Sequence, residues 1–268
     1  MQFFGRIKRL AKSIRSYKDH PGFPLRGRSM NQPSVSVVIP VYNGKTVLER
    51  AITLSLQYLS SISPDFELII AEDGSTDGSA DLVRGFVIQD SRVRLLHSDV
   101  RLGRGRALHG AFREAKAPIV CYYDVDLATN MDCLHELIGA IDEGYDIAIG
   151  SRLLPGSSIK RTEGRDFASK GYNSLVRFVL RSKLIDHQCG FKSFRRDRIL
   201  AIAEKVHSEH WSWDTDVLVR AQRAGFRIKE FPVSWEQSIG TTVRRRDVIS
   251  MGFDVFRLWW QIHLTDTE

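Results

Sequence analysis

Two aspartates separated by one residue are the sharpest chemical signal in this chain. Asp124 and Asp126 directly follow the apolar run at 119–123, which is typical of a buried strand. Two carboxylates at this spacing at a strand end can hold a hard divalent cation, which in turn binds phosphate oxygens. The alternative is a pair of turn carboxylates without a ligand. We favour the metal-binding interpretation.

Two further polar clusters follow apolar runs in the same way. Residues 40–43 (PVYN) come at the end of the first run, and residues 72–79 (EDGSTDGS) come after the second. Either cluster alone could form a turn, and Asp77 or Ser79 is expected to cap a following helix. In an open parallel sheet, however, ligands gather beyond the carboxyl ends of the strands. Three such clusters at one sheet edge therefore predict a binding site.

Strands and helices must alternate along the chain to bring these clusters together. Runs of β-branched residues predict strands, and apolar residues at helical spacing predict helices. The predicted strands are 35–41, 66–71, 93–97, 119–123, 146–150, 191–194 and 228–233. The predicted helices are 46–59, 79–90, 105–115, 131–143, 167–183, 198–204, 213–224 and 248 to about 263. This alternation predicts an α/β fold with a doubly wound, mostly parallel sheet.

The chain carries a net charge of +7, but this charge is unevenly distributed. Residues 1–30 contain 8 basic and 1 acidic side chains, which leaves 31 of each sign in the remaining 238 residues. A body without net charge is not built as a nucleic-acid groove, so we expect no nucleic-acid partner.

The basic N-terminal segment has the pattern of an interfacial helix. Apolar residues recur at helical spacing within 2–18, and six Lys and Arg side chains fill the other face. This pattern predicts binding to an anionic membrane surface. Two alternatives are a helix docked on the protein's own core and a disordered basic arm. Pro and Gly residues within 20–33 then predict a linker.

Three cysteines without CxxC spacing supply neither a zinc site nor an even disulfide framework. A reducing compartment fits this content. No uncharged apolar run approaches the ~18 residues of a membrane-spanning helix, and no signal peptide is expected. Residues 102–107 (LGRGRA) superficially resemble a dinucleotide-binding glycine motif, but they do not follow the first strand.

Several motifs together resemble one enzyme family. The segments 39–43 (IPVYN), 72–79 (EDGSTDGS), 124–126 (DVD) and 150–152 (GSR) resemble family 2 inverting glycosyltransferases with the GT-A fold. Within that family, later segments are similar to the dolichyl-phosphate glucosyltransferase branch, with dolichyl-phosphate mannose synthases as near relatives. These segments are 186–192 (DHQCGFK), 210–216 (HWSWDTD), 233–235 (VSW), Gly240 and 251–252 (MG). The resemblance covers roughly residues 34–260.

The resemblance implies a role for each matching residue on the donor side. Asp124 and Asp126 would bind Mg²⁺ or Mn²⁺ and the diphosphate of a nucleotide sugar. Some mannose synthases carry a further metal ligand where this chain has Ala128, so water or another oxygen would complete the metal shell here. The other implied donor residues are Pro40, Tyr42 and Asn43 at the nucleoside, Glu72 and Asp73 at ribose and base, and Arg106 near the diphosphate.

The acceptor side is implied by the same resemblance. Arg152, Arg165 and Ser169 match positions that hold the acceptor phosphate in the mannose synthases. The residues that would grip the sugar or the acceptor are Gln188, Gly190 and Lys192.

The chemistry expected of such an acceptor is simple. A phosphate monoester is already anionic at pH 7, so its attack on the anomeric carbon needs no general base. Asp214 and Asp216 could act as a base in relatives with hydroxyl acceptors, or they could fix Arg and Lys side chains near the site. We favour the second role.

These observations predict a peripheral enzyme on the cytoplasmic face of a membrane. It would transfer a hexose with inversion, preferentially glucose from UDP-glucose, to a polyprenyl or dolichyl phosphate. The alternatives are mannose transfer from GDP-mannose, a GT-A transferase with a hydroxyl acceptor, and a non-catalytic lipid or nucleic-acid binding module. The predicted organisation is an arm and linker at 1–33, a GT-A domain at 34–247 and an amphipathic helix at 248–268.

Overall fold

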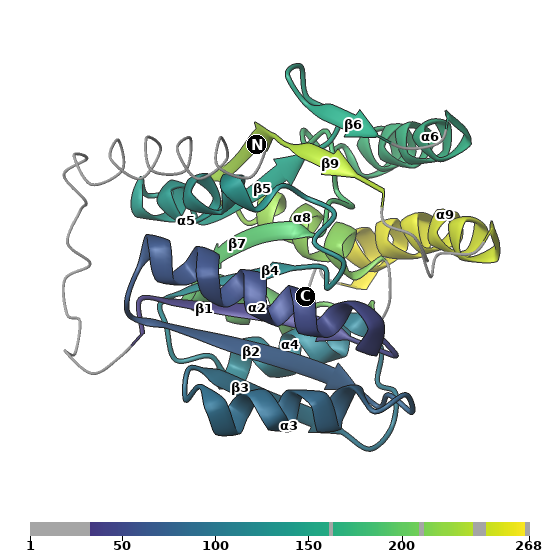
Figure 1. Cartoon of the computed structure of the whole chain (residues 1–268). Helices are drawn as coiled ribbons and strands as arrows, with labels where there is room; N and C mark the ends of the chain where they lie inside the picture. Colours follow the sequence, from purple (N-terminus) through teal and green to yellow (C-terminus); the bar gives the residue numbers. More distant parts are fainter. Residues whose placement is uncertain (1–32, 161–162, 209–211, 238–244, 266–268) are drawn as a thin grey trace.

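The structure is a computed structural model that describes residues 33–160, 163–208, 212–237 and 245–265. A seven-stranded sheet lies at the centre of this part of the chain, with helices on both of its faces (Figure 1). The interfacial helix predicted within 2–18 lies outside the described residues, and it stays a prediction.

The strands of the central sheet lie close to their predicted positions. They are β1 (Val35–Val41), β2 (Phe66–Asp73), β3 (Val93–Ser98), β4 (Ile119–Tyr123), β5 (Ile147–Ser151), β7 (Phe191–Arg195) and β8 (Ile228–Pro232). Their order is β3-β2-β1-β4-β7-β5-β8. Strand β7 runs antiparallel to β4 and β5, whereas the other neighbouring pairs are parallel. The predicted mostly parallel α/β sheet is therefore confirmed.

Each predicted helix has a counterpart, although the boundaries shift. The helices are α2 (Lys45–Ile62), α3 (Ser79–Gln89), α4 (Arg104–Glu114), α5 (Leu134–Asp142), α6 (Glu163–Leu180), α7 (Arg196–Ala203), α8 (Trp213–Arg223) and α9 (Arg245–Trp260). A 3₁₀ turn, η1 (Met131–Cys133), precedes α5, and a π-helical turn, η2 (Gln261–Thr265), follows α9. Helix α6 begins and ends earlier than the predicted 167–183.

Strand β1 shows how the sheet is buried on both faces. Val37 and Ile39 belong to the apolar cluster that includes Ile52 of α2, together with residues of α3 and α5. Val38 points to the opposite side and joins Leu108 of α4, together with residues of α7 and α8. Burial on both faces is typical of parallel sheets, and it explains the continuous apolar runs in the sequence.

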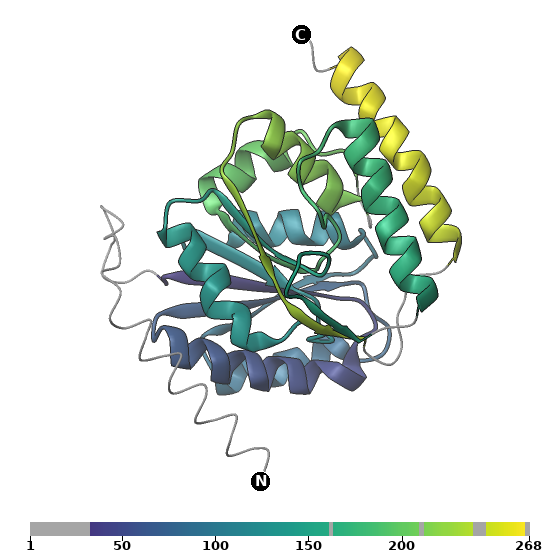
Figure 2. The ribbon, with the colours of Figure 1, turned by 90° about the horizontal axis from the view of Figure 1, so that it is seen from above.

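Helices α6 and α9 pack together beside this core. Figure 2 shows them side by side along one edge of the molecule. Val176 of α6, Val255 and Leu258 of α9, and Val219 of α8 belong to a third apolar cluster. Neither helix, nor any other in the described part of the chain, is long and apolar enough to cross a membrane.

A two-stranded sheet escaped prediction because each of its strands has three residues. It consists of β6 (Ser158–Lys160) and β9 (Ser234–Glu236). Strand β9 also fixes the loop after β4. The Asn130 N–H donates to the Ser234 carbonyl at 2.8 Å, and the Glu236 N–H donates to the Ala128 carbonyl at 2.9 Å. This pairing sets Trp235 beside the loop that carries the Asp124–Asp126 pair.

Candidate active site

The segments after β1 and β2 meet at the carboxyl edge of the sheet, as the sequence predicts. The Asn43 N–H donates to Ser75 Oγ at 2.9 Å, and Asn43 Oδ1 accepts the Thr76 N–H at 2.9 Å. Asn43 has a positive φ of 51°, a conformation that Asn tolerates better than most residues. The two segments therefore form one hydrogen-bonded corner.

Glu72 and Asp73, the predicted ribose and base residues, are both buried at this corner. The two Asp73 carboxylate oxygens accept the N–H groups of Leu102 at 2.6 Å and Gly103 at 3.0 Å. Glu72 contacts the ring of His97. Both carboxylates therefore anchor β3 and the loop before α4, and their contact with a nucleoside stays a prediction.

The other predicted donor residues surround this corner. Tyr42 is 38% exposed, and the Arg101 guanidinium lies 4.0 Å from the centroid of its ring. An exposed ring offers a surface on which a nucleobase can stack. Pro40 is half-buried within β1, and Arg106 is exposed on α4.

Asp124 and Asp126 lie at the end of β4, and each carboxylate is held by a neighbour. Asp124 Oδ1 accepts a hydrogen bond from Arg104 Nη2 at 2.9 Å, and its side chain is 43% exposed. Asp126 Oδ1 accepts the Ala128 N–H at 3.1 Å. The two aspartates also line a small pocket together with Gly190 and Trp235.

Gly190 is required by the position of Asp124. The Asp124 N–H donates to the Gly190 carbonyl at 3.2 Å, so the two backbones run close together. A Cβ atom at residue 190 would lie 1.9 Å from Asp124 Oδ2. Any other residue would therefore displace the carboxylate or the loop that carries Gly190.

The donor set at this edge fits a cation that is shared with a ligand. No cluster of three or more His, Cys, Asp or Glu side chains with metal-binding geometry occurs within the described residues. Two carboxylates supply hard oxygen ligands, and Mg²⁺ in particular is bound by one or two carboxylates plus substrate phosphates and water. Asp124 and Asp126 therefore suit a metal that is held jointly with a diphosphate.

A largely buried group of polar side chains lies next to Asp124. Asp214, at the start of α8, accepts hydrogen bonds from Arg104 Nη1 at 2.6 Å, from Lys192 Nζ at 2.9 Å and from the Tyr122 hydroxyl. We call these four residues the Asp214 cluster. Burial alone would raise the pKa of Asp214, but Lys192 and Arg104 outweigh it and lower that pKa. The Asp214 carboxylate is therefore ionised and enclosed.

The Asp214 cluster reaches Asp124 by two routes. Arg104 bridges Asp214 and Asp124 directly with its two terminal nitrogens. Lys192 Nζ also donates to the Cys189 carbonyl at 2.5 Å, next to Gly190. The cluster thus fixes the Asp124 carboxylate and the loop against it. Lys192 itself is fully buried, and its predicted contact with the sugar or acceptor stays a prediction.

The sequence did not reveal all of this cluster. Arg104 lies in the segment 102–107 (LGRGRA), in which the resemblance predicts a role for Arg106 only. Tyr122 is predicted as an ordinary aromatic residue of a strand. Asp214 was expected either to act as a base or to fix basic side chains, and its contacts match the second role. Asp216 similarly holds Arg220 Nε at 2.6 Å on the same helix.

Arg152 directly follows β5, which is separated from β4 by β7 in the central sheet. Its Nε and Nη2 donate to the two oxygens of the fully buried Asp186 at 2.7 and 2.9 Å. Burial would lower the pKa of Arg152, but Asp186 raises it above its usual range. The Arg152 guanidinium also lies 5.8 Å from the Trp235 ring, which lines the pocket. The predicted acceptor arginine is therefore charged and held in place.

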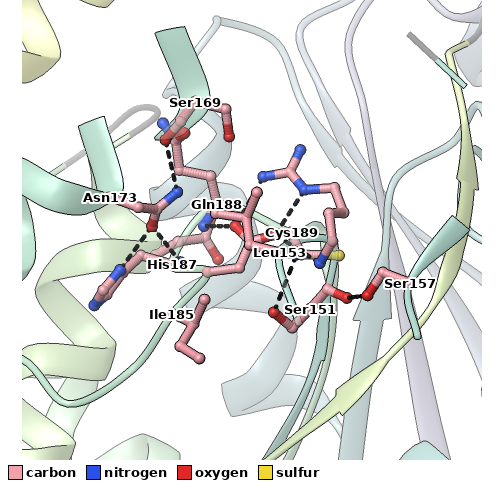
Figure 3. A network of polar contacts seen from close by, with 12 residues as sticks. Ser151, Leu153, Ser157, Ser169, Asn173, Ile185, His187, Gln188 and Cys189 are labelled. Atoms are coloured by element: carbon pink, nitrogen blue, oxygen red, sulfur yellow. Dashed lines mark hydrogen bonds and ion pairs between the residues drawn. The ribbon is translucent and has the colours of Figure 1, made fainter. Parts of the chain in front are cut away.

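A hydrogen-bonded chain connects α6 with the segment before β7 (Figure 3). The Asn173 amide donates to the Ser169 carbonyl at 3.0 Å, and Asn173 Oδ1 accepts from the backbone and ring N–H groups of His187, both at 2.8 Å. Burial lowers the pKa of His187 to about 4, so the ring is neutral at pH 7. This chain fixes the segment that carries Gln188.

Ser169 and Arg165 are the predicted acceptor residues on α6. Ser169 Oγ is buried and has no hydrogen-bond partner within the described residues. Arg165 lies four residues earlier in α6, and its side chain is not among those that the structure describes. An unpartnered buried hydroxyl favours a polar ligand at this position.

Comparison with known proteins identifies the family. Residues 36–202 match the model "Glycosyl transferase family 2", which covers more than half of the chain. The chain belongs to glycosyl transferase family 2. The predicted family is thereby confirmed.

Two relatives resemble this family 2 chain over most of its length. Glycosyltransferase AglD of Haloferax volcanii is 46% identical over 232 residues, which are 85% of this chain and 37% of AglD. The dolichyl-phosphate beta-glucosyltransferase ALG5A of Trichomonas vaginalis is 30% identical over 84% of this chain and 72% of that protein. The family 2 chain therefore spans little more than a third of AglD.

A solved structure shares the fold. Glucosyl-3-phosphoglycerate synthase from Mycobacterium tuberculosis, in complex with Mn²⁺, UDP-glucose and phosphoglyceric acid, superposes with a TM-score of 0.63 at 16% identity. The match covers 85% of this family 2 chain and 79% of the synthase. This similarity supports the predicted GT-A type of fold.

Proposed function

We propose that this family 2 glycosyltransferase moves a hexose from a nucleotide sugar to a polyprenyl phosphate, with inversion at the anomeric carbon. The observation that carries the proposal is the position of the Asp124–Asp126 pair. In the order of the strands, it lies between the corner with Tyr42 and Asn43 after β1, which suits a nucleoside, and the fixed guanidinium of Arg152 after β5, which suits an anionic acceptor. A donor and an acceptor can therefore approach the same two carboxylates from opposite sides.

Glucose from UDP-glucose is the preferred donor. The similarity to the glucosyltransferase ALG5A supports this choice, as does the absence of a third acidic ligand at Ala128. Mannose from GDP-mannose is the alternative that the same motifs allow, because neither the corner formed by the segments after β1 and β2 nor the pocket identifies the sugar.

Asp124 and Asp126 would hold Mg²⁺ or Mn²⁺ against the donor diphosphate. The bound cation would neutralise the charge that develops on the leaving group. The Asp214 cluster would keep the Asp124 carboxylate in position through Arg104. Preorganised charge of this kind is usually a large part of catalysis, since it costs no reorganisation during the reaction.

The acceptor phosphate would attack without a general base. A phosphate monoester has its second pKa near ~6, so it is an anion at pH 7. Asp214 is enclosed by its partners and does not offer a base to a hydroxyl acceptor. Arg152, Arg165 and the hydroxyl of Ser169 would bind the phosphate through charge-assisted and polar hydrogen bonds. A polyprenyl phosphate resides in a membrane, and we propose that the enzyme works at the cytoplasmic face of that membrane.

The direct test is an assay of purified full chain with a panel of radiolabelled nucleotide sugars. Each donor is combined with a short polyprenyl phosphate or with the corresponding polyprenol, and Asp126→Ala measures the background. We expect label in the lipid only with the phosphate acceptor, and most strongly from UDP-glucose. Transfer to polyprenol, or sugar release without transfer, would refute the proposal.

A further inference from the structure

Helices α6 and α9 are apolar on two sides. One side of each helix packs into the cluster that contains Val176 and Val255. The other side is exposed and carries large aromatic residues. We call this set the α6–α9 aromatic face; its exposed fractions are 81% for Phe167, 85% for Phe178, 72% for Phe253, 55% for Phe256, 39% for Trp259 and 60% for Trp260.

The spacing of these residues shows that the exposure is organised. Phe167 and Phe178 are eleven residues apart on α6, which corresponds to about three helical turns and places them on the same side. Phe253, Phe256 and Trp260 follow the i, i+3, i+7 spacing on α9. Scattered exposed apolar residues are ordinary, but aromatic residues gathered on two neighbouring helices mark an interaction surface.

The same two helices expose basic side chains, whereas their described acidic residues, Asp166 and Asp254, are half-buried. Every exposed charged side chain that the structure describes on α6 and α9 is basic, namely Lys170, Arg177 and Arg257. Arg181 and Lys183, directly after α6, are also exposed. Trp and Phe beside Lys and Arg are the composition of helices that lie in the interface of an anionic bilayer.

We propose that the α6–α9 aromatic face docks on an anionic lipid bilayer. The aromatic rings enter the headgroup region, and the basic side chains contact lipid phosphates. The evidence is independent of the interfacial helix predicted within 2–18. The inference rests on the proposed function in one respect, since a lipid-linked acceptor gives the docking its purpose.

Docking at this face also explains the position of the acceptor end of the site. Helix α6 carries Ser169 as well as Phe167 and Phe178, and its Asn173 holds the His187 ring. Helix α9 contacts the same segment, because Gln188 Nε2 lies 3.9 Å from Met251 Sδ. A bilayer against these helices would place a lipid phosphate next to Ser169 and Gln188 without drawing the prenyl chain into water.

The test is vesicle binding by the full chain, read from tryptophan fluorescence. Vesicles contain phosphatidylserine and brominated phosphatidylcholine, whose bromine atoms quench a tryptophan that enters the bilayer. Trp213 is buried in the core, so quenching reports on exposed tryptophans. We expect quenching that is lost in large part in Trp260→Phe. This readout does not depend on residues 2–18, which contain no tryptophan.

A double variant and a matched control measure the contribution of the face. Phe178→Ser with Phe253→Ser should weaken vesicle binding by roughly tenfold or more, because each exposed ring buries apolar surface in the bilayer. Ile88→Ser with Val100→Ser removes one exposed apolar side chain on α3 and one in the loop after β3, which are 86% and 64% exposed, and should leave binding unchanged. Equal binding by both double variants would overturn the inference.

Further outcomes separate this inference from the proposed function. Vesicle binding through Trp260 without sugar transfer would support the docking face and refute the transferase proposal. Sugar transfer to a short polyprenyl phosphate without quenching in vesicles would do the reverse. If the wild type sediments as a dimer that Phe178→Ser with Phe253→Ser dissociates, the face binds a second copy and the bilayer proposal fails.

Discussion

The Asp214 cluster and the α6–α9 aromatic face depart from ordinary packing in opposite ways. In the cluster, an ionised carboxylate, a lysine and an arginine lie inside the protein, where charges are costly unless they are paired. On the aromatic face, large apolar rings are exposed to solvent, and contact between apolar surface and water is unfavourable. We infer that the buried charges are retained because they position the site, and that the exposed rings are retained because they bind a partner surface.

The two regions are expected to have different roles. The Asp214 cluster affects the chemistry of the reaction, and the aromatic face determines where the enzyme is located. The buried cluster fixes one carboxylate, Asp124, through short contacts, so a change there should alter metal and donor binding. Among the described residues, the aromatic face makes no hydrogen bond or ion pair with Asp124, so a change there should alter where the enzyme works and leave its chemistry intact. The following predictions test this separation, from the largest expected effect to the smallest.

Removal of a carboxylate that we propose to bind the metal should have the largest effect. Asp126→Ala should lower kcat by at least ~10²-fold, by analogy with the loss of one electrostatic stabiliser. The control is Asp81→Asn, which removes a carboxylate that is 81% exposed on α3 and should keep full activity. Full activity of the wild type in EDTA would contradict metal dependence.

Loss of the Asp214 charge should impair both the stability of the protein and the proposed metal site. Asp214→Asn leaves the buried Lys192 and the half-buried Arg104 beside a neutral amide, and it should reduce the free energy of unfolding by about 3 kcal/mol. Asp216→Asn, two residues later on α8, breaks the comparable buried pair with Arg220 and should destabilise similarly. Denaturant titration measures both.

Mn²⁺ affinity then distinguishes the two variants. Electron paramagnetic resonance in the presence of UDP should show weaker Mn²⁺ binding in Asp214→Asn only, because only Asp214 holds Arg104 against Asp124. Equal Mn²⁺ affinities in the two variants would reduce Asp214 to a general role in stability.

The His187 ring should make stability depend on pH. Its pKa falls from an ordinary 6.5 to about 4 in the folded state because it is buried. The unfolded chain therefore binds more protons between these values, and stability falls as the pH drops from 6.5 toward 4. We expect a loss of about 2 kcal/mol at about pH 5 relative to pH 8. Denaturant titrations over this pH range give the free energy of unfolding of the wild type and of His187→Gln. This free energy should fall more steeply with decreasing pH in the wild type; parallel pH dependences would mean that the ring is not buried.

Arg165→Lys should have a smaller effect, confined to the acceptor. A lysine cannot reproduce the two-pronged contact of a guanidinium with phosphate. The apparent KM for polyprenyl phosphate should rise by roughly tenfold, as expected for about 1.4 kcal/mol, while UDP-sugar affinity stays nearly unchanged. Steady-state kinetics with each substrate varied in turn measure this. If donor binding falls and acceptor saturation does not change, Arg165 belongs to the donor side.

Much of the fold could be predicted because its signals are local. The apolar runs at β1 and β4 gave the observed strand boundaries, and buried parallel strands require such runs. The antiparallel direction of β7 is set by tertiary pairing with β4 and β5, which a single segment does not encode. The strands β6 and β9 are too short to show a period.

The sequence predicted those parts of the candidate site whose residues are close together along the chain. Asp124 and Asp126 stand out because they are adjacent to a strand end. Arg104 and Asp214 are 110 residues apart, and only the folded chain shows that they meet. Resemblance to a family pointed to Arg106, which is exposed, whereas the half-buried Arg104 makes the contact with Asp124.

The central claim is that this enzyme joins a sugar to a lipid phosphate with inversion. The most direct measurement is the ³¹P and ¹³C NMR spectrum of the product formed from UDP-[1-¹³C]glucose and a short polyprenyl phosphate. We predict a phosphodiester signal with carbon–phosphorus coupling to an anomeric carbon in the β configuration. An unchanged phosphate monoester beside a glycosylated product, or an α-configured diester, would contradict the account.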